Sequence, residues 1–410
     1  MNDKYQVHRM MYEFVKTADD PQMKLGAEWL GSVFRAVDEG LPIVYHSFTM
    51  FSEVMVALDL QSICCEGWDI MAMMADPQHP LKSMDVACEA GIPEDLCSFD
   101  KALIGSVLRE TIPPPTMIVL SASPCQNMMI SYQAVSELTG APLWVSDSPY
   151  NLNQEGAIEY WTSQYKGLIG FLEEHSGRKM DYDRLREVLE ESNCCVEYWL
   201  EGMELMKLKP APWTGAFGVG TFAGITTFGT PSATAAVKAV RDQIKDRVAK
   251  GETAVPEEKA RMIFFHLMPS WDQALVYWLS SQGVVMPFMV FDDYRVEPVD
   301  TSTPESMIKG MAKRALNTPM GKLGRGAFDE YIEDMLYAVD EWQGDCVVIT
   351  AHPGCKWVTG GYGLIKRACR ERGIPLLIYD IDLADPRMTS ADESRAKIGE
   401  FLATVIQHKV

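Results

Sequence analysis

The stretch DCVVITAHPGCKWVTGGYGLIKRAC, residues 345–369, places an apolar run, a turn and a helical pattern around one cysteine. Residues 346–350 are apolar and rich in β-branched side chains, which favours a buried strand, and Pro353 and Gly354 end this run with turn chemistry. Cys355 is therefore predicted to lie just past the carboxyl end of a parallel strand, the edge at which open α/β sheets bind ligands. A small buried hydrophobic residue is the alternative interpretation of any single cysteine.

Apolar strand patterns alternate with helical patterns on both sides of this stretch. The stretches that carry strands are 41–47, 117–120 and 141–150 in the first half, and 261–270, 284–294, 346–355 and 374–385 in the second. This alternation predicts an α/β protein with two flavodoxin-like or Rossmann-like parallel-sheet domains, an N-terminal helical segment and a helical middle layer. The expected divisions are 1–40 for the helical segment, 41–156 for the first α/β domain, 157–255 for the helical layer and junction, and 256–410 for the second α/β domain.

The composition of the 410-residue chain excludes several classes of protein. A formal net charge of −20 argues against a general nucleic-acid binder, which needs a basic face. No apolar run approaches the roughly 20 residues that span a bilayer, and residues 1–10 lack the apolar region of a signal peptide. We therefore expect a cytoplasmic protein with no membrane or nucleic-acid partner.

An anionic substrate of so acidic a chain would need a local basic patch. The glycine-spaced loop GKLGRG, residues 321–326, is the best local candidate for holding phosphates, through Lys322 and Arg325. A solvated turn is the alternative.

The ten cysteines favour metal binding or redox chemistry over disulfides in a cytoplasmic chain. Cys97, Cys125 and Cys355 each follow a helix or strand boundary marked by proline or glycine. Residues 93–95 are expected to start a helix, which would put Cys97 in its first turn, where the helix dipole favours a thiolate. Three such thiolates on an iron–sulfur cubane would leave one iron open to a substrate oxygen, and zinc held by three cysteines is the simplest alternative.

These motifs resemble the catalytic subunits of 2-hydroxyacyl-CoA dehydratases and of the related ATP-dependent benzoyl-CoA reductases. The resemblance covers most of the chain and rests on residues 93–105 (PEDLCSFDKALIG), 113–150, 181–193 (DYDRLREVLEESN) and 354–387. It implies two α/β domains with a [4Fe–4S] cluster ligated by Cys97, Cys125 and Cys355, and one iron that lacks a protein ligand.

The resemblance also implies the partners of the chain. Members of the family act on acyl-CoA substrates as dimers of related subunits, so a heterodimer is expected, and a separate ATP-hydrolysing iron–sulfur activator delivers single electrons. The chain itself has no P-loop, which agrees with ATP being handled elsewhere. In the dehydratases, which are oxygen-sensitive enzymes of anaerobic amino acid fermentation, the electron turns the thioester carbonyl into a ketyl radical anion.

Three further residues are candidates for the chemistry. Ser47, at a strand end, resembles the residue that in some dehydratase subunits hydrogen-bonds the water on the open iron, and His46 and Glu66 are candidate acid–base partners. A purely structural role is the alternative for each of the three. Cys64 and Cys65 depart from the simple pattern, because two extra thiols near the site leave room for a double-cubane cluster.

Three hypotheses for function follow. The first is a subunit of an (R)-2-hydroxyacyl-CoA dehydratase, a carbon–oxygen lyase. The second is a subunit of a benzoyl-CoA or double-cubane type of reductase. The third is a non-catalytic companion subunit whose cluster only relays electrons.

Overall fold

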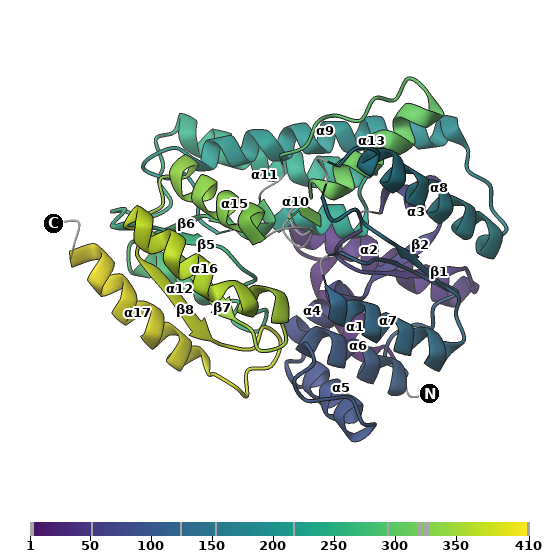
Figure 1. Ribbon diagram of the computed structural model, residues 1–410, viewed down its shortest axis with the longest axis horizontal. Coiled ribbons are helices and arrows are strands. Elements are labelled where there is room, and N and C mark those ends of the chain that lie inside the picture. Colours follow the sequence, from purple (N-terminus) through teal and green to yellow (C-terminus); the bar gives the residue numbers. More distant parts are fainter. Residues whose placement is uncertain are drawn as a thin grey trace. The chain divides into compact units, whose positions relative to one another are not determined.

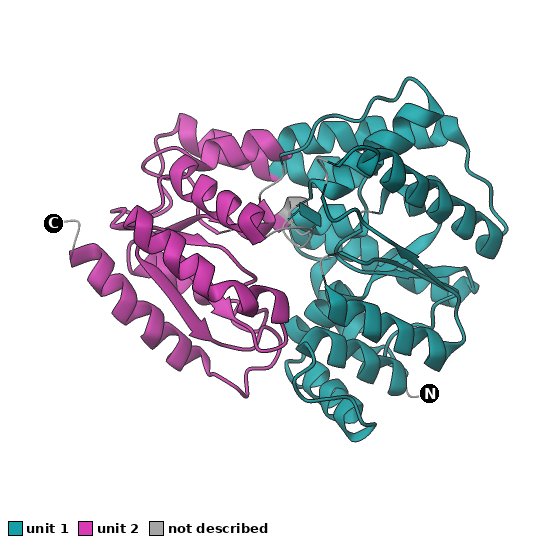
Figure 2. Cartoon of the chain, viewed as in Figure 1, with its two compact units in different colours: residues 1–198, 219–239, 294–326 teal, residues 199–218, 240–293, 327–410 magenta. Residues whose placement is uncertain are grey.

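The structure is a computed structural model that describes residues 4–50, 52–123, 125–151, 154–215, 218–292, 295–318, 321–322 and 328–407 (Figure 1). The chain forms two compact units (Figure 2): residues 1–198, 219–239 and 294–326 in the first, and 199–218, 240–293 and 327–410 in the second. Each unit contains one four-stranded parallel sheet, so the predicted α/β class with two parallel sheets is confirmed. The four predicted domain ranges stay a prediction.

The sheet of the first unit has the order β2-β1-β3-β4, with every neighbouring pair parallel. Its strands are β1 (Ile43–His46), β2 (Gln61–Cys64), β3 (Met117–Ser121) and β4 (Leu143–Ser146). The chain leaves β1 toward β2 at one edge and then returns to the other side of β1 to form β3 and β4. The carboxyl ends of β1 and β3 therefore border the point where the strand order reverses, which is where open α/β sheets bind ligands.

The sheet of the second unit repeats this topology in the order β6-β5-β7-β8, again with all pairs parallel. Its strands are β5 (Ala260–Phe264), β6 (Val284–Met289), β7 (Cys346–Ala351) and β8 (Leu376–Asp380). The order matches the flavodoxin-like arrangement, in which the first strand lies inside the sheet and the second at its edge. The reversal point here lies between β5 and β7, and the stretch around Cys355 follows β7.

Helices cover the sheets and fill the segments between the strands. Those before the middle of the chain are α1 (Gln6–Val15), α2 (Pro21–Glu39), α3 (Glu53–Ala57), α4 (Cys65–Ala75), α5 (Gln78–Glu89), α6 (Ser98–Leu108) and α7 (Gln126–Thr139). The middle of the chain contains α8 (Ala157–Ser176), α9 (Tyr182–Met206), α10 (Gly218–Thr226) and α11 (Pro231–Ala249). The remainder are α12 (Leu275–Ser281), the 3-10 turn η1 (Val290–Asp292), α13 (Pro304–Leu316), α15 (Phe328–Glu341), α16 (Lys356–Arg372) and α17 (Ala391–Gln407). None of the described helices is long and apolar enough to cross a bilayer.

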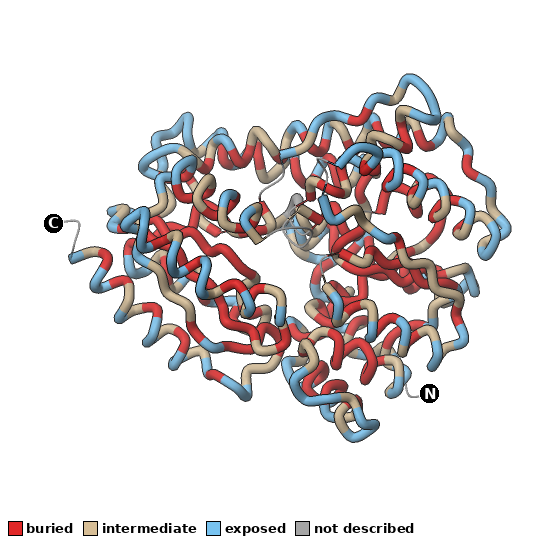
Figure 3. The backbone as a smooth tube through the Cα atoms, viewed as in Figure 1, coloured by how far each residue is buried: buried red, intermediate tan, exposed pale blue. Residues whose placement is uncertain are grey.

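Both faces of the first sheet are buried, as its apolar runs require. Ile43 and Tyr45 of β1 point into the cluster on one face, whereas Val44 between them points into the cluster on the other. The central strands β1, β3, β5 and β7 are buried along their whole length (Figure 3). The loops after these strands are thus held by a rigid, apolar base.

The first turn of α6 differs from the sequence prediction. Residues 93–96 form a turn, closed by a hydrogen bond of 3.1 Å from the Leu96 N–H to the Pro93 carbonyl, and the helix begins only at Ser98. Cys97 is extended and lies immediately before the helix, not within its first turn.

Candidate functional site

Four cysteines share one position relative to a helix, that of the residue just before the first turn. Cys64 precedes α4, Cys97 precedes α6, Cys125 precedes α7 and Cys355 precedes α16. The first N–H groups of a helix have no acceptor within the helix, and the positive end of the dipole favours an anion. A thiolate is therefore stabilised at each of these positions, which suits a metal ligand.

Cys97 and Cys355 show how this local geometry acts on a thiol. Burial raises the pKa of both thiols, and two backbone N–H groups in the helix turn that follows each cysteine lower it. Both side chains are only partly buried, as is that of Cys125. These three thiols thus combine backbone donors with access from outside the core.

The charges of Cys97 and Cys125 interact within the first unit. After burial, Asp100 and then Cys125 raise the pKa of the Cys97 thiol, because each is an anion in its neighbourhood. A bound cationic centre would relieve this repulsion and deprotonate both thiols. Cys355 has the same local setting in the second unit. Within either unit, no three described His, Cys, Asp or Glu side chains form a ready-made metal site.

A [4Fe–4S] cluster fits this donor set. Thiolates are the ligands that iron–sulfur clusters take, and helix N-termini supply the N–H groups that stabilise their charge. Cys97 and Cys125 would hold it from the first unit and Cys355 from the second. The fit rests on the local geometry of each cysteine.

Ser47 follows the carboxyl end of β1 and is completely buried. Its hydroxyl lies 2.5 Å from the hydroxyl of Thr49 and accepts a weaker hydrogen bond of 3.4 Å from the Thr49 N–H. Two hydroxyls this close form a pair in which one donates to the other, so one hydrogen remains for a further acceptor.

Glu66 lies in the first turn of α4 and reaches the same loop. Its carboxylate accepts hydrogen bonds from the Phe48 N–H at 3.2 Å, the Tyr132 hydroxyl at 3.2 Å and the Cys64 thiol at 3.5 Å. Burial raises the pKa of Glu66 to about 7, although the hydrogen bonds from Phe48 and Tyr132 lower it. A carboxyl group with this pKa can accept or release a proton near neutrality.

His46 is buried at the end of β1 and is neutral at pH 7, because burial lowers its pKa to about 4. Its Nδ1 lies 3.0 Å from the Ser47 carbonyl, and its Nε2 has no hydrogen-bond partner among the described residues. Its own carbonyl accepts from the Tyr132 hydroxyl at 3.1 Å. The three predicted residues at this sheet edge are thus brought into one hydrogen-bonded group.

Two members of this group were missed by sequence reasoning. Tyr132, from α7, donates to both Glu66 and the His46 carbonyl, and Asp100, from α6, accepts a short hydrogen bond from Ser131. Burial raises the pKa of Asp100 to about 6. The signal available in the sequence was their spacing, three residues after Cys97 and seven after Cys125, on the inward face of the helix that each cysteine begins.

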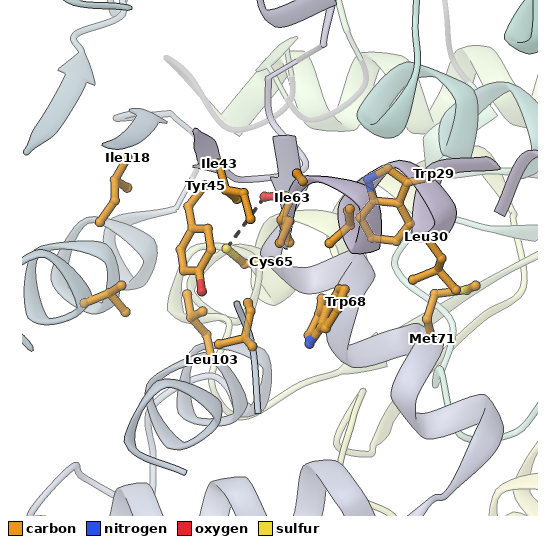
Figure 4. Close-up of a cluster of buried hydrophobic side chains, with 14 of the residues drawn as sticks. Trp29, Leu30, Ile43, Tyr45, Ile63, Cys65, Trp68, Met71, Leu103 and Ile118 are labelled. Atoms are coloured by element: carbon orange, nitrogen blue, oxygen red, sulfur yellow. Dashed lines mark hydrogen bonds between the residues drawn. The ribbon is translucent and has the colours of Figure 1, made fainter. Parts of the chain in front are cut away.

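The two extra thiols, Cys64 and Cys65, lie in different surroundings. Figure 4 shows Cys65 inside the apolar cluster beside Tyr45, with its thiol directed to the Ile63 carbonyl at 3.9 Å. Cys64 is fully buried and donates to Glu66. Burial raises the pKa of both thiols well above the ordinary value.

The carboxyl edge of the second sheet holds a second polar group that sequence reasoning did not single out. His266 Nδ1 lies 2.8 Å from the Thr350 hydroxyl, which itself donates to the Leu267 carbonyl, and His352 Nδ1 lies 3.5 Å from Asp382. Burial lowers the pKa of His266 to about 3, so its ring is neutral. These groups flank the reversal point between β5 and β7, on the strand that leads to Cys355.

The basic loop predicted to hold phosphates is described only in part. Lys322 is half-buried and its backbone N–H bonds to the Thr318 carbonyl at 2.8 Å. Arg325 lies outside the described residues. The role of this loop stays a prediction.

Comparison with known proteins finds one family and several relatives. The family model for "2-hydroxyglutaryl-CoA dehydratase, D-component" matches residues 50–405. The (R)-phenyllactyl-CoA dehydratase alpha subunit of Clostridium sporogenes is 26% identical over 320 residues, 75% of this chain and 76% of its own. The (R)-2-hydroxyisocaproyl-CoA dehydratase alpha subunit of Clostridioides difficile is 23% identical over 402 residues, 93% and 95%. One subunit of the benzoyl-CoA reductase of Thauera aromatica is 26% identical over 353 residues, 78% and 79%.

Proposed function

Because the chain belongs to the 2-hydroxyglutaryl-CoA dehydratase D-component family, we propose that it is a catalytic subunit of an (R)-2-hydroxyacyl-CoA dehydratase, a carbon–oxygen lyase. Relatives that cover most of its length are alpha subunits of such dehydratases. The observation that carries the proposal is the shared position of Cys97, Cys125 and Cys355, each immediately before a helix.

These three cysteines would hold a [4Fe–4S] cluster. When bound, such a cluster supplies one-electron transfer and, at an iron without a protein ligand, a Lewis acid for a substrate oxygen. The backbone N–H groups at the starts of α6, α7 and α16 would stabilise the thiolates.

The reaction itself needs an electron because its two bonds are otherwise hard to break. The β-proton of an acyl thioester is weakly acidic and the 2-hydroxyl is a poor leaving group. One electron added to the thioester carbonyl gives a ketyl radical anion, which expels hydroxide. Loss of the β-proton then gives the ketyl of the enoyl thioester, which returns the electron. The products are the enoyl-CoA and water, with no net change in redox state.

The residues at the edge of the first sheet supply the proton chemistry in this proposal. Glu66, with a pKa near 7, accepts the β-proton or protonates the departing hydroxide, and Tyr132 holds its carboxylate in place. The Ser47 and Thr49 hydroxyl pair donates one hydrogen bond to the substrate or to water at the open site. All four side chains are buried, so bulk water does not compete.

Two partners complete the enzyme. The relatives are named as alpha subunits, which implies a second, related subunit. An ATP-hydrolysing iron–sulfur activator is the proposed source of the single electron, and the reaction would be oxygen-sensitive.

A reductase subunit is the second candidate, favoured by the 26% identity to the benzoyl-CoA reductase subunit of Thauera aromatica. The two reactions differ in electron demand, since a dehydratase regenerates its electron and a reductase consumes two electrons per product. Turnover of an (R)-2-hydroxyacyl-CoA by the assembled, anaerobically purified enzyme with sub-stoichiometric reductant is expected. A requirement for two electrons per product would reject the dehydratase.

The cluster type and the companion-subunit alternative have separate tests. Iron and sulfide analysis is expected to give about four of each per chain, and about eight would favour the double cubane. Ser47→Ala is expected to slow turnover at least ten-fold while leaving the iron content unchanged. Unchanged turnover in this variant would favour a non-catalytic companion.

A further inference from the structure

The first unit contains a second cavity, outside the group around Ser47 and Glu66. Its volume is about 540 Å³, within the range of roughly 300–1,000 Å³ that small-molecule sites occupy. It is lined by one face of α13, by the segment 295–300 and by Ile158 near the start of α8.

The cavity wall is basic although the chain is strongly acidic. Four cationic side chains and two carboxylates line it, so its formal charge is +2 in a chain of net charge −20. The cations are Arg295, Lys309, Lys313 and Arg314, and the carboxylates are Glu297 and Asp300. Such a concentration of positive charge raises the local concentration of anions.

The cations differ in how far the protein neutralises them. Lys309 forms an exposed ion pair of 2.9 Å with Glu159. Lys313 is exposed, and in the part of the chain that the structure describes no carboxylate lies within ion-pair distance of it. A phosphate bound here would therefore meet at least one cation whose charge is not already used.

Arg314 is the rigid part of the wall, because it is almost completely buried. It donates to Glu53 at 2.6 Å and to Ser192 at 2.7 Å, and also to Asn193, while its Nε has no hydrogen-bond partner among the described residues. Glu53 lies at the start of α3, on the loop that carries Ser47. The cavity is thus tied directly to the proposed catalytic loop.

Helix α13 separates the cavity from that loop. Positions 306, 309, 310, 313, 314 and 317 face the cavity, at the three- and four-residue spacing of one helix face. Ala315 and Leu316, on other faces, line a narrow crevice with the hydroxyls of Thr49, Ser121 and Ser146 at the carboxyl edge of the first sheet. The two spaces are therefore about one helix diameter, roughly 10 Å, apart.

We propose that this cavity binds phosphate groups of an adenine nucleotide moiety, through Lys309, Lys313 and Arg295, with Arg314 as a fixed positive base. The inference rests on the proposed function for its ligand, the nucleotide end of the acyl-CoA. The pantetheine arm of coenzyme A is longer than a helix is wide, so the thioester would reach the crevice beside Thr49. A free nucleotide carries the same phosphate chemistry and is the other source.

The test is direct binding of CoA, ATP and pantetheine to the assembled full-length protein, measured by calorimetry at low ionic strength. Lys313→Glu is expected to weaken CoA binding about ten-fold and to leave pantetheine binding unchanged, because pantetheine lacks the nucleotide phosphates. The matched control is Lys24→Glu, an equal charge change at an exposed position of α2 that lines no cavity, and it is expected to change CoA binding less than two-fold. Thermal unfolding midpoints verify that both variants are folded.

Each result has a defined meaning. Loss of CoA affinity identifies the thioester as the source, and loss of ATP affinity alone identifies a free nucleotide. Unchanged binding of both ligands in Lys313→Glu overturns the inference, as would loss of CoA binding only in Lys322→Glu. CoA binding needs no turnover, so the absence of dehydratase activity would reject the proposed function and leave this result standing. In an active enzyme, Lys313→Glu should raise KM for the acyl-CoA and leave kcat unchanged.

Discussion

Single cysteines in this chain differ chiefly in their surroundings. Cys97 and Cys125 are partly exposed and precede helices, whereas Cys65 lies in the apolar core and Cys194 is exposed in the middle of α9. Only the first pair combines access with backbone N–H donors, which is what a ligand to iron needs. Residue type alone would not separate them.

This difference predicts how iron content responds to substitution. Cys97→Ser and Cys125→Ser are each expected to remove most of the iron and sulfide from the anaerobically purified protein, because an alcohol is a poor substitute for a thiolate ligand. Cys194→Ser is the matched control and should retain the wild-type iron content. The measurement is iron and sulfide per chain together with the visible absorption of the cluster. Full cluster occupancy in Cys97→Ser would show that this thiol is not a ligand.

Glu66 predicts a specific pH dependence of stability. Burial raises its folded pKa to about 7 from an ordinary value of 4.5, so the folded state holds this proton more tightly than the unfolded state. The stabilisation is therefore complete below about pH 4.5 and is lost as pH rises through 7. Relative to Glu66→Gln, the wild-type free energy of unfolding should fall by about 1–3 kcal/mol between pH 5 and pH 8.

Urea unfolding of both iron-free proteins across that range measures this difference, and the titrations they share cancel. The glutamine variant has its own constant cost, because its amide cannot accept all three donors. A wild type that gains stability over the variant as pH rises would contradict the raised pKa of Glu66.

At the scale of elements, the sequence predicts long apolar strands better than short ones. β3 and β7 are continuous apolar runs, and both were predicted. β2 (Gln61–Cys64) was missed, because four residues that include two polar ones carry too little periodicity to distinguish a strand from a turn. The start of α6 was placed early, because residues 93–95 form a turn that resembles a helix start in sequence.

The packing of α6 on α5 predicts the effect of one added methyl group. A Cβ on Gly105 would lie 1.7 Å from the Ser83 carbonyl oxygen, a backbone atom that cannot rotate away. Gly105→Ala should therefore force α6 from its position and lower the free energy of unfolding by about 3 kcal/mol or more. Because Cys97 precedes this helix, the variant should also bind less iron.

Gly170→Ala in α8 is the matched control, since nothing lies within 4 Å of its added Cβ. This variant should gain about 0.5–1 kcal/mol, because alanine loses less backbone entropy than glycine in a helix. Denaturant unfolding compares the two substitutions. Equal effects would show that the contact between α5 and α6 is looser than the structure has it.

At the scale of the molecule, the two sheets repeat one topology, and this was predictable in class but not in detail. Alternating apolar strands and helices predict parallel sheets, yet the strand order depends on which loops cross which edge. The hydrogen bonds of Tyr132 to Glu66 and to the His46 carbonyl were also beyond prediction, because they join residues 66 and 86 positions apart. Family resemblance supplied the choice of cysteines, and the structure supplied their common position before helices.

Each unit has its own sheet and core, which predicts what iron removal does to the whole molecule. The proposed ligands precede helices at sheet edges, so the apolar clusters that stabilise each unit do not include the cluster site. Chelation under anaerobic conditions should therefore leave the helical circular dichroism signal unchanged and lower the thermal midpoint by a few degrees, through the loss of ligand-linked stability. Small zinc domains behave differently, because there metal binding is the folding free energy. Chelator should cause no further change in Cys97→Ser, which has already lost the cluster. Collapse of the helical signal on chelation would mean that the cluster, and not the two cores, maintains the fold.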